Sequence, residues 1–481
     1  MIKKSKRIKI IEEFKKNTNN APDINYKDFE FNDEAITFIY SMSVSSSNDI
    51  NDFILRRIDE DKDKIKSNNL YEYVKNYIPN NNILSFSEEK KISYYVMSGF
   101  TVCVFDDGKL LAFENRANIY SPINKSENEK GIKGPSDAFS ENYQFNMGMI
   151  RRRLKTEKLW IDEATVGSES KTKVALFYIK GVSNEQMVKK ISKRINNINI
   201  KYVGNTNYII DAISNTNRFI FPTTLATQRP DFACQMLLEG RIVLMAENSN
   251  EVIILPCMFI DFFKNPEDYY EKSLNVIGNR IIRIIALFLA ILTPAVYISL
   301  MAYNQEALPS GLLINFSIQR DGVPFSTVFE IIVMSFMFYI LRESDMRFPG
   351  KGGSSISIVG ALVLGQAAVE AGIVSPITII IVGISSVASL AFSSIELINS
   401  IKWVQLFLII LAALFGFIGV MFGFIMLMAL LISQNSCGKP YFSPFEPFNF
   451  KAQKDAIITK KSAKFNPDIV YDKDDDDEKN S

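Results

Sequence analysis

The sequence contains no histidine, and only four cysteines and two tryptophans occur among its 481 residues. The absence of histidine removes the commonest general base and metal ligand of proteins. No phosphate-binding loop, nucleophile elbow or paired set of metal ligands occurs either. These absences argue against an enzyme and against a bound metal or cofactor.

The cysteines, Cys103, Cys234, Cys257 and Cys437, lie far apart and form no CxxC pair. The first three belong to a region that we expect in the cytoplasm, where disulfides are rare. We therefore expect most of them to be small, buried hydrophobic residues.

A secretory leader is also missing. The N-terminal sequence MIKKSKRIKIIEEFKKN has neither an apolar core nor a small-residue cleavage site. We therefore expect residues 1–280 to remain in the cytoplasm. Residues 1–33 are basic and then Asn-rich, a composition that predicts a flexible tail.

Charge is unevenly distributed along the chain. Charged residues make up 22% of the whole chain, but this figure is an average over two different regions. Residues 1–280 are polar, whereas residues 281–434 contain few charges and are dominated by long apolar runs. We interpret this as an α/β cytoplasmic region followed by an α-helical polytopic membrane domain. The predicted units are the tail (1–33), two cytoplasmic lobes (34–155 and 156–280), the membrane domain (281–434) and a polar C-terminal tail (435–481).

Both lobes contain strand signals. In the first lobe, residues 94–105 are the clearest strand, and residues 110–113 are its predicted hairpin partner. In the second lobe a strand at 173–180, a helix and a strand at 198–203 follow one another, an order that favours a parallel sheet. The predicted buried face of that helix consists of Met187, Val188, Ile191 and Ile195.

Arg151, Arg152 and Arg153 close a predicted helix within residues 134–156. Two interpretations stay open: a solvated face that complements the helix dipole, or a salt-bridging surface for a neighbouring subunit. Nucleic acid is disfavoured as a partner, because no broader basic patch with aromatic residues accompanies the triplet.

The region after residue 280 contains apolar runs of different lengths. Residues 284–303 have the length of a full membrane span and follow Arg280 and Arg283. Residues 324–341 and 373–392 are further candidate spans.

Residues 403–432 exceed what a bilayer requires, which predicts a single tilted or partly emergent helix. With residues 312–323 at the interface and residues 356–372 re-entrant, the chain crosses four times and its Lys-containing tail lies inside. Five full crossings with the tail outside are the alternative.

Residues 354–376 are apolar enough for a bilayer, yet they carry a glutamine, a glutamate and many small residues. A helical projection at about 100° per residue gives two stripes. One stripe consists of Ser355, Val359, Val363, Gln366 and Glu370. The other, on nearly the opposite face, consists of Ala361, Gly365, Ala368 and Gly372.

Small residues at helical spacing allow close packing in lipid, whereas a carboxylate that faces lipid is costly. Two interpretations follow: a tightly packed structural helix, or a pore helix with a constriction at Val359 and Val363. Four charged residues flank the apolar runs and either couple the lobes to the membrane domain or anchor helix ends at its surface. They are Glu330, Arg342, Glu343 and Arg347.

Several motifs follow one another in order along the chain. They are GPSDAFSENYQFNMGMIRRR (134–153), RPD (229–231), LLEGR (237–241), DYYEKSLNVIGNRIIRIIALFLAILTPAVY (268–297), RDGVPF (320–325) and VGALVLGQAAVEAGIVSP (359–376). Together they resemble the A subunits of spore germinant receptors, the GerA family, over most of the chain. Ser136 and Gln228 stand where that family usually has charged residues, so we expect one of its typical ion pairs to be missing.

The resemblance implies a subunit of a nutrient-sensing complex in the inner membrane of bacterial spores. In that family the A subunit works with a polytopic, transporter-like B subunit and a C-subunit lipoprotein, and it resembles a homo-oligomeric, nutrient-gated cation channel. A secondary transporter and a non-conducting scaffold subunit are the alternatives. We find no internal repeat of membrane helices of the kind that a transporter favours.

Overall fold

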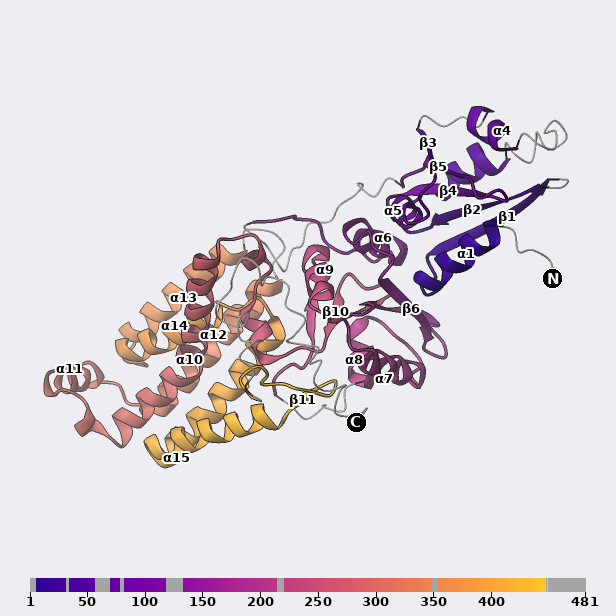
Figure 1. Cartoon of the computed structure of the whole chain (residues 1–481). Helices are drawn as coiled ribbons and strands as arrows, with labels where there is room; N and C mark the ends of the chain where they lie inside the picture. The colour runs from indigo at the N-terminus through magenta and orange to yellow at the C-terminus, as the bar shows by residue number, and fades with distance from the viewer. Residues whose placement is uncertain are drawn as a thin grey trace, which may run out of the picture.

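The computed structural model describes residues 6–31, 34–56, 70–77, 82–117, 133–213, 220–347, 353–446 and 448. The molecule is elongated: two α/β lobes follow one another from the N-terminus, and a layer of long helices extends beyond the second lobe (Figure 1). Most of the polar tail predicted for residues 435–481 lies outside the described residues.

The first lobe is built on an antiparallel five-stranded sheet in the order β1-β2-β4-β5-β3. Its strands are β1 (Ile24–Phe31), β2 (Glu34–Ser41), β3 (Ile83–Phe86), β4 (Phe100–Phe105) and β5 (Leu110–Glu114). Its helices are α1 (Lys6–Asn17), α2 (Ser47–Asp49), the π-helical turn η1 (Ile50–Leu55), α4 (Leu70–Tyr77) and α5 (Lys91–Met97). Each face of the sheet has its own apolar core, one with α1 and α5 and the other with η1 and α4.

The flexible tail predicted for residues 1–33 is wrong for residues 6–31. Helix α1 buries Ile10 and Phe14, and β1 pairs with β2 over its whole length. A few well-spaced apolar side chains order this segment against the sheet, which the average composition of the segment does not reveal.

The strand predicted at residues 94–105 is only half a strand. Its first part belongs to α5, and the strand β4 begins after Gly99, which has a φ of 89°. Glycine reaches this backbone conformation without strain, so the turn from helix to strand is placed here. The predicted hairpin partner is confirmed, because β5 pairs antiparallel with β4.

The second lobe has a sheet in the order β6-β7-β9-β10-β8, and every pairing in it is antiparallel. Its strands are β6 (Leu159–Val166), β7 (Thr172–Ile179), β8 (Leu225–Thr227), β9 (Ile242–Ala246) and β10 (Val252–Leu255). Its helices are α6 (Tyr143–Arg153), α7 (Glu185–Asn196), α8 (Thr206–Ile213) and α9 (Pro230–Leu238).

The predicted parallel sheet is therefore wrong. Residues 198–203 form no strand, although the amides of Ser168 and Glu169 donate to the carbonyls of Ile200 and Lys201. The chain passes through α7 and α8 before the next strand, and an isolated strand–helix signal does not fix which strand pairs next. The predicted helix itself is confirmed, since α7 buries the four apolar residues expected on its face.

Helix α6 belongs to the second lobe. Tyr143, Met147 and Ile150 join the core of the second sheet, so the lobes divide before α6 rather than near residue 155. Arg151 is fully buried, and its Nε and Nη2 donate to the two carboxylate oxygens of Asp23 at 3.1 and 3.0 Å. A solvated face is the wrong interpretation for Arg151, because its partner lies in the first lobe of the same chain.

The ion pair between Asp23 and Arg151 joins the two lobes. Burial alone would raise the pKa of Asp23, but Arg151 and the hydroxyls of Ser41 and Ser43 outweigh burial and hold that pKa below its ordinary value. The indole nitrogen of Trp160 also donates to a backbone carbonyl at the end of α1, at 2.9 Å. An ion pair and a hydrogen bond thus hold the first lobe against the second.

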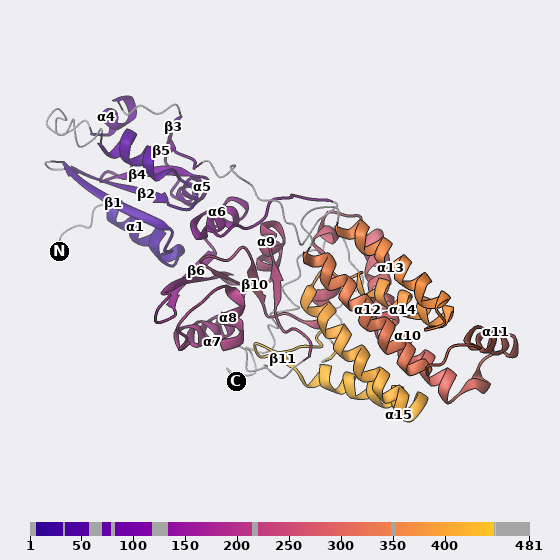
Figure 2. The same cartoon turned by 180° about the vertical axis from the view of Figure 1, so that it is seen from behind.

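Beyond the second lobe lies a layer of helices. They are α10 (Ser273–Ala302), the turn η5 (Gln305–Ala307), α11 (Ser310–Arg320), α12 (Thr327–Arg347), α13 (Gly353–Glu370), α14 (Pro376–Ser389) and α15 (Ile395–Ser433). Helices α10 and α15 are long and apolar enough to cross a membrane. Helix α10 is central, packing against α12, α14 and α15 (Figure 2).

The single tilted helix predicted at residues 403–432 is wrong, because α15 folds back on itself. Gly416 has a φ of 59° and a ψ of −142°, a combination open to glycine and not to L residues. The two legs, residues 395–415 and 417–433, then pack closely: a methyl group at Gly423 would lie 2.6 Å from Cδ2 of Leu408. Tyr303 covers the reversal, and its hydroxyl donates to the carbonyl of Ala413 at 2.6 Å.

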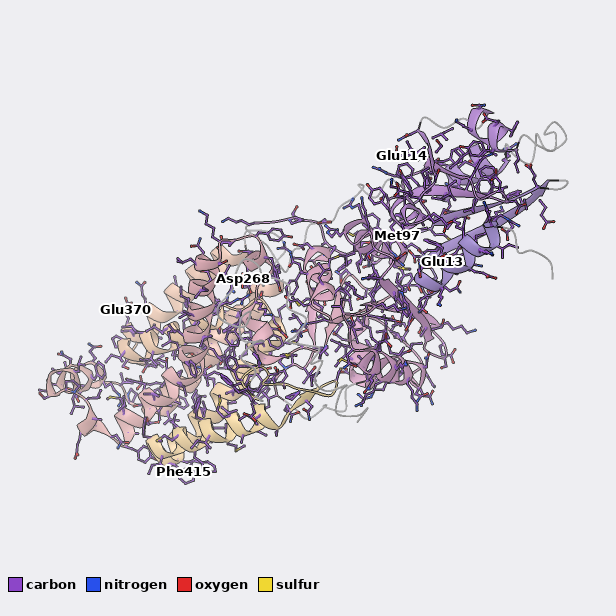
Figure 3. All side chains as sticks on the ribbon, in the orientation of Figure 1. Glu13, Met97, Glu114, Asp268, Glu370 and Phe415 are labelled. Carbon is purple, nitrogen blue, oxygen red and sulfur yellow. The ribbon has the colours of Figure 1, made fainter. Side chains whose placement is uncertain are left out.

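Six helical segments therefore run along the layer: α10, α12, α13, α14 and the two legs of α15. The predicted re-entrant segment is part of α13, a continuous helix of 18 residues. The end of α14 and the start of α15 lie near the second lobe, since Ser393 donates to Asn265 and Ser400 donates to the carbonyl of Ile220. Phe415, directly before the reversal, lies on the side of the layer away from the lobes (Figure 3).

After α15 the chain returns to the second lobe. It forms a small ladder of β11 (Asn435–Ser436) and β12 (Lys439–Pro440). Ser436 donates to the carbonyl of Thr223, and Tyr441 donates to that of Pro222, each at 2.8 Å. The chain therefore enters the helical layer from the second lobe and returns to the same lobe when it leaves the layer.

Candidate functional site: the α13 face and the ionic joint

Helix α13 carries the stripe that the sequence singles out. Val363, Gln366 and Glu370 are all exposed, and 56% of Val363 is accessible. Ser355 and Val359 lie earlier on the same helix, and their side chains are outside the described part of the structure. The described half of the stripe thus points away from the other helices of its own chain.

Glu370 lies at the C-terminal end of α13, on the helical layer and away from the lobes (Figure 3). A negative charge is disfavoured at this end of a helix, because the last carbonyl groups are already partly negative. Glu370 and Gln366 line a shallow depression between α13 and α14, together with Ile379 and Ile380. The depression therefore combines a carboxylate and an amide with an apolar wall.

The described residues of the small-residue stripe pack against their own chain, and Gly365 also borders the depression. Gly365 is buried, and a methyl group there would lie 3.7 Å from Ile379 of α14. Ala368 is half-buried and packs against the core of the helical layer. Gly372 follows α13 in a turn with a φ of 67°, and the side chain of Ala361 is outside the described part.

Glu330 is fully buried near the start of α12, at the far end of the layer. Its Oε2 accepts hydrogen bonds from the Ser375 amide and the Thr378 hydroxyl, both at 2.8 Å. Arg320 lies 3.7 Å from its other oxygen. Because Ser375 is the N-cap of α14, Glu330 neutralises the positive end of that helix.

Arg342, Glu343 and Arg347 lie in the second half of α12, at the end near the lobes. Arg342 is half-buried, and its Nη1 donates to the Ser389 hydroxyl at the end of α14 at 3.4 Å. Glu343 is exposed, and the side chain of Arg347 is outside the described residues. The structure does not bring these three residues together with Glu330, which lies at the opposite end of the same helix.

A second set of charges lies where the lobe meets the helical layer (Figure 3). We call it the ionic joint, and it consists of Glu239, Arg241, Asp261, Lys264, Asp268, Arg280 and Arg283. Six of them are less than 5% exposed, and Arg283 is 8% exposed.

One half of the ionic joint surrounds Arg241. Its Nη2 donates to Asp261 at 2.8 Å and its Nη1 donates to the carbonyl of Pro256. Burial alone would lower the pKa of Arg241, but Asp261 and Glu239 outweigh it and raise that pKa above its ordinary value. Lys264 lies 3.6 Å from Glu239 and 3.7 Å from Asp261, so the charges alternate.

The other half surrounds Asp268. Arg283 donates to both carboxylate oxygens, with the shortest contact 2.9 Å, and Arg280 donates to Oδ2 at 3.3 Å. Arg283 also donates to the carbonyl of Phe263 at 2.8 Å. Both arginines belong to α10, whereas Asp268 lies in the 3₁₀ turn η4 (Pro266–Tyr269) at the edge of the lobe. The start of the helical layer is therefore tied to the lobe by charge-assisted hydrogen bonds.

Sequence reasoning missed the ionic joint. The aromatic residues of segment 258–272 favour a place near lipid headgroups, but Phe259 and Phe262 are buried inside the protein. A usable signal was present: Arg280 and Arg283 are three residues apart, a spacing that places them on one helical face, and Asp261 and Asp268 precede them. Among the described residues, no cluster of acidic or sulfur side chains is arranged to hold a metal ion.

Comparison with known proteins shows which family shares this architecture. The model of the family "Bacillus/Clostridium GerA spore germination protein" matches residues 12–468. The chain belongs to the GerA family. The resemblance found in its motifs is thereby confirmed.

Several relatives of this GerA-family chain span most of its length. Spore germination protein KA of Bacillus subtilis is 33% identical, with 94% of this chain and 84% of that protein covered. GerQA of Bacillus cereus is also 33% identical, with 89% and 85% covered. The uncharacterized membrane protein YfkQ of Bacillus subtilis is 32% identical, with 92% and 86% covered.

Among solved structures, the N-terminal domain of the A subunit of the Bacillus megaterium spore germinant receptor GerK3 is similar to the lobes. It is 26% identical, it covers 52% of this chain and 94% of its own, and the TM-score is 0.41.

Membership gives the motifs of this GerA-family chain a structural meaning. Arg229 and Asp231 of the RPD motif form a buried two-point ion pair at 3.1 and 2.8 Å, and Tyr270 also donates to Asp231. Gln228, directly before this motif, donates to Glu251 at 3.0 Å. The RPD motif thus marks polar contacts inside the second lobe and with Tyr270, in the segment that leads to α10.

Proposed function

We propose that this chain is the A subunit of a germinant receptor and that its helical layer lies in the inner membrane of the spore. The two lobes lie on the cytoplasmic side, and both ends of the layer meet them. Its partners are further copies of the chain, a polytopic transporter-like B subunit and a C-subunit lipoprotein. In the assembled oligomer the chain forms a nutrient-gated cation channel.

The exposed stripe of α13 carries the channel proposal. Val363, Gln366 and Glu370 point outward from a layer that exposes many apolar side chains. A carboxylate is expensive against lipid and acceptable against water or protein. Several copies arranged with α13 toward a common axis remove this cost and place a ring of carboxylates beside a cation path, as in cation-selective pores.

Helical spacing extends this proposal to the remaining stripe residues. Val359 and Val363 are one turn apart, so in the oligomer they form the apolar constriction, and Ser355 lies one turn nearer the lobes. Gly365, Ala368 and Gly372, with Ala361, lie on the packing side of α13. Gly365 and Ala368 contact their own chain, which supports this division of the two faces.

The charges of α12 take two different roles in this proposal. Arg342, Glu343 and Arg347 lie at the lobe end of the layer, where a movement of the lobes reaches α12 and the start of α13. Glu330 caps α14 at the far end and keeps α12 and α14 together while the lobe end moves. The ionic joint transmits the movement from the lobe to α10.

Two substitutions test the proposed pore. In spores that carry the variant as their sole copy, Val363→Ala widens the constriction and raises basal cation leak. Glu370→Gln removes the carboxylate ring and slows nutrient-triggered cation release about tenfold, the effect of about 1.4 kcal/mol on the barrier. Flux is measured with cation-selective electrodes and in liposomes that contain the purified protein.

Matched controls separate the stripe from its surroundings. Leu364→Ala changes the next residue, which is 44% exposed but lies off the stripe. Glu306→Gln removes another exposed carboxylate, in η5. Unchanged leak and release in both stripe variants, with normal protein levels, rejects the pore and leaves the scaffold alternative. Uptake of the nutrient itself by the liposomes supports the transporter alternative instead.

A further inference from the structure

An apolar cavity lies between the helical layer and the second lobe. Its volume is about 350 Å³. Its walls come from the 3₁₀ turn η3 (Phe259–Phe263), α10, both legs of α15 and the segment that follows β12. The lining includes Phe263, Leu287, Phe288, Leu427, Met428 and Phe442.

The chemistry of the lining limits the occupant. No polar atom contributes to the surface of the cavity. A water molecule needs several polar partners to occupy a buried site, so water is disfavoured here. The volume falls at the lower end of the range of ligand pockets. The occupant is therefore an apolar group of moderate size.

The cavity opens onto the outer surface of the helical layer. Phe288 lines it and is also 41% exposed, next to the exposed Ile285 and Leu289 of the same helix. The lining residues of α10 begin with Ile284, directly after Arg283 of the ionic joint. If the layer lies in a bilayer, this opening faces hydrocarbon just below the headgroups of the leaflet on the lobe side.

The composition of the C-terminal tail disfavours it as the occupant. Residues 449–481 are dominated by Lys, Asp and Asn, and their short apolar runs are flanked by charges. A charged segment in a cavity without polar partners would be strongly disfavoured.

We propose that this cavity binds one acyl chain of a phospholipid from the leaflet on the lobe side. The inference rests on the membrane location given under the proposed function, and it is independent of ion conduction. The bound chain fills the space between η3, α10 and the hairpin of α15, and so contacts the elements that carry Asp261, Arg280 and Arg283. Its presence stabilises the packing around the ionic joint, because an unfilled cavity lacks dispersion contacts on its walls.

The experiment uses the full chain in liposomes of phosphatidylethanolamine and phosphatidylglycerol that contain a phospholipid with a diazirine in its acyl chain. After irradiation, the adducts are located by mass spectrometry. We expect saturable labelling of Leu427, Met428 and Leu287, and non-saturable labelling of outward residues such as Ile418, which is 77% exposed.

Two variants fill the cavity. Leu427→Trp places a large side chain in it, and we expect about tenfold fewer adducts at Met428 and Leu287, because an overfilled site resists a further group. Ile291→Phe is a milder variant on the opposite wall and is expected to act in the same direction. Ile425→Trp is the control: it lies on the same leg, is 63% exposed, and leaves the cavity labelling unchanged.

The outcomes separate the two levels of the proposal. Adducts on Ile418 without saturable adducts in the cavity overturn the acyl-chain site and leave the membrane location standing. An absence of adducts over the whole helical layer overturns the membrane location itself. Cavity adducts that persist at full level in both Leu427→Trp and Ile291→Phe also overturn the site, because the label then comes from bulk lipid.

Discussion

The ionic joint and the α13 face both place ionisable side chains among apolar ones, but they do so in opposite ways. In the joint, Asp268 is buried between Arg280 and Arg283, which belong to another element of the same chain. On α13, Glu370 is exposed at the end of a helix, where the helix dipole does not favour it.

The comparison separates charges that stabilise the fold of a single chain from a charge whose role depends on the oligomer. A buried ion pair is costly to break, because removal of one partner leaves the other uncompensated. Neutralising an exposed carboxylate changes the free energy of unfolding little. It affects function only where another molecule contacts that carboxylate. Substitutions at the two places are therefore expected to affect different measurements.

The largest expected effect on stability is at the joint. Asp268→Asn removes the charged acceptor that the buried Arg280 and Arg283 share and lowers the free energy of unfolding by about 3–5 kcal/mol. Thermal unfolding of the detergent-solubilised protein and its yield from membranes measure this. Asp107→Asn is the control, since Asp107 pairs with Lys109 at the surface. If both variants unfold alike, the joint does not stabilise the chain.

The reversal in α15 gives the next largest effect. Gly416→Ala forces an L residue into a strained backbone conformation and brings its methyl group to 2.8 Å from the ring of Tyr303. We expect a loss of about 1–3 kcal/mol in the free energy of unfolding.

Gly278→Ala is the matched control for this reversal. Gly278 lies inside α10, and no atom is within 4 Å of the added methyl group. We expect a gain of about 0.5–1 kcal/mol there, because alanine favours a helix. A tolerated Gly416→Ala would mean that α15 continues straight through this residue.

Acid tests the pair between Asp23 and Arg151. The pKa of Asp23 is lowered in the folded protein, so the pair contributes its full stability above the ordinary pKa of an aspartate, 3.8. That contribution decreases as the pH falls through the lower, folded-state pKa. We expect the difference in melting temperature between the wild type and Asp23→Asn to be constant near neutral pH. The difference should shrink as the pH falls below the ordinary aspartate pKa of 3.8. A difference that is independent of pH down to complete acid unfolding contradicts the assignment.

The smallest expected effect on stability is at Glu370. Glu370→Gln changes the free energy of unfolding by less than about 0.5 kcal/mol, because the side chain is exposed. The same variant is expected to slow cation release markedly, so stability and flux diverge at this residue. A parallel loss of both indicates that Glu370 is a structural residue, and the comparison with Asp268 then fails.

Local patterns in the sequence predicted several elements of the fold. The apolar periodicity of α7, the hairpin of β4 and β5 and the end of the first long helix are confirmed, whereas that helix begins at Ser273, before the predicted span. For α13, helical spacing separated a stripe whose described residues are exposed from a stripe that includes the buried Gly365. These features depend on neighbours within a few residues, which is the range over which periodicity carries information.

The remainder of the fold depended on distant partners. Composition predicted a flexible segment at residues 6–31, but α1 and β1 are held by contacts with the sheet. The order of strand, helix and strand favoured a parallel sheet, but pairing is decided by the whole path of the chain. The triplet at Arg151 allows a solvated face or a salt bridge to another subunit, but the partner of Arg151 is Asp23, 128 positions away in the same chain.

The sequence by itself determined the family, the division into polar lobes and an apolar helical region, and the two faces of α13, because these follow from ordered motifs, composition and local spacing. Only the tertiary structure decided that residues 395–433 form two helical legs and that Asp268 joins the lobe to α10. The reversal depends on the backbone of one glycine, Gly416, and on the ring that packs against it. The ionic joint depends on opposite charges that folding brings close together. A hydropathy pattern reveals neither the backbone conformation of a glycine nor the pairing of distant charges.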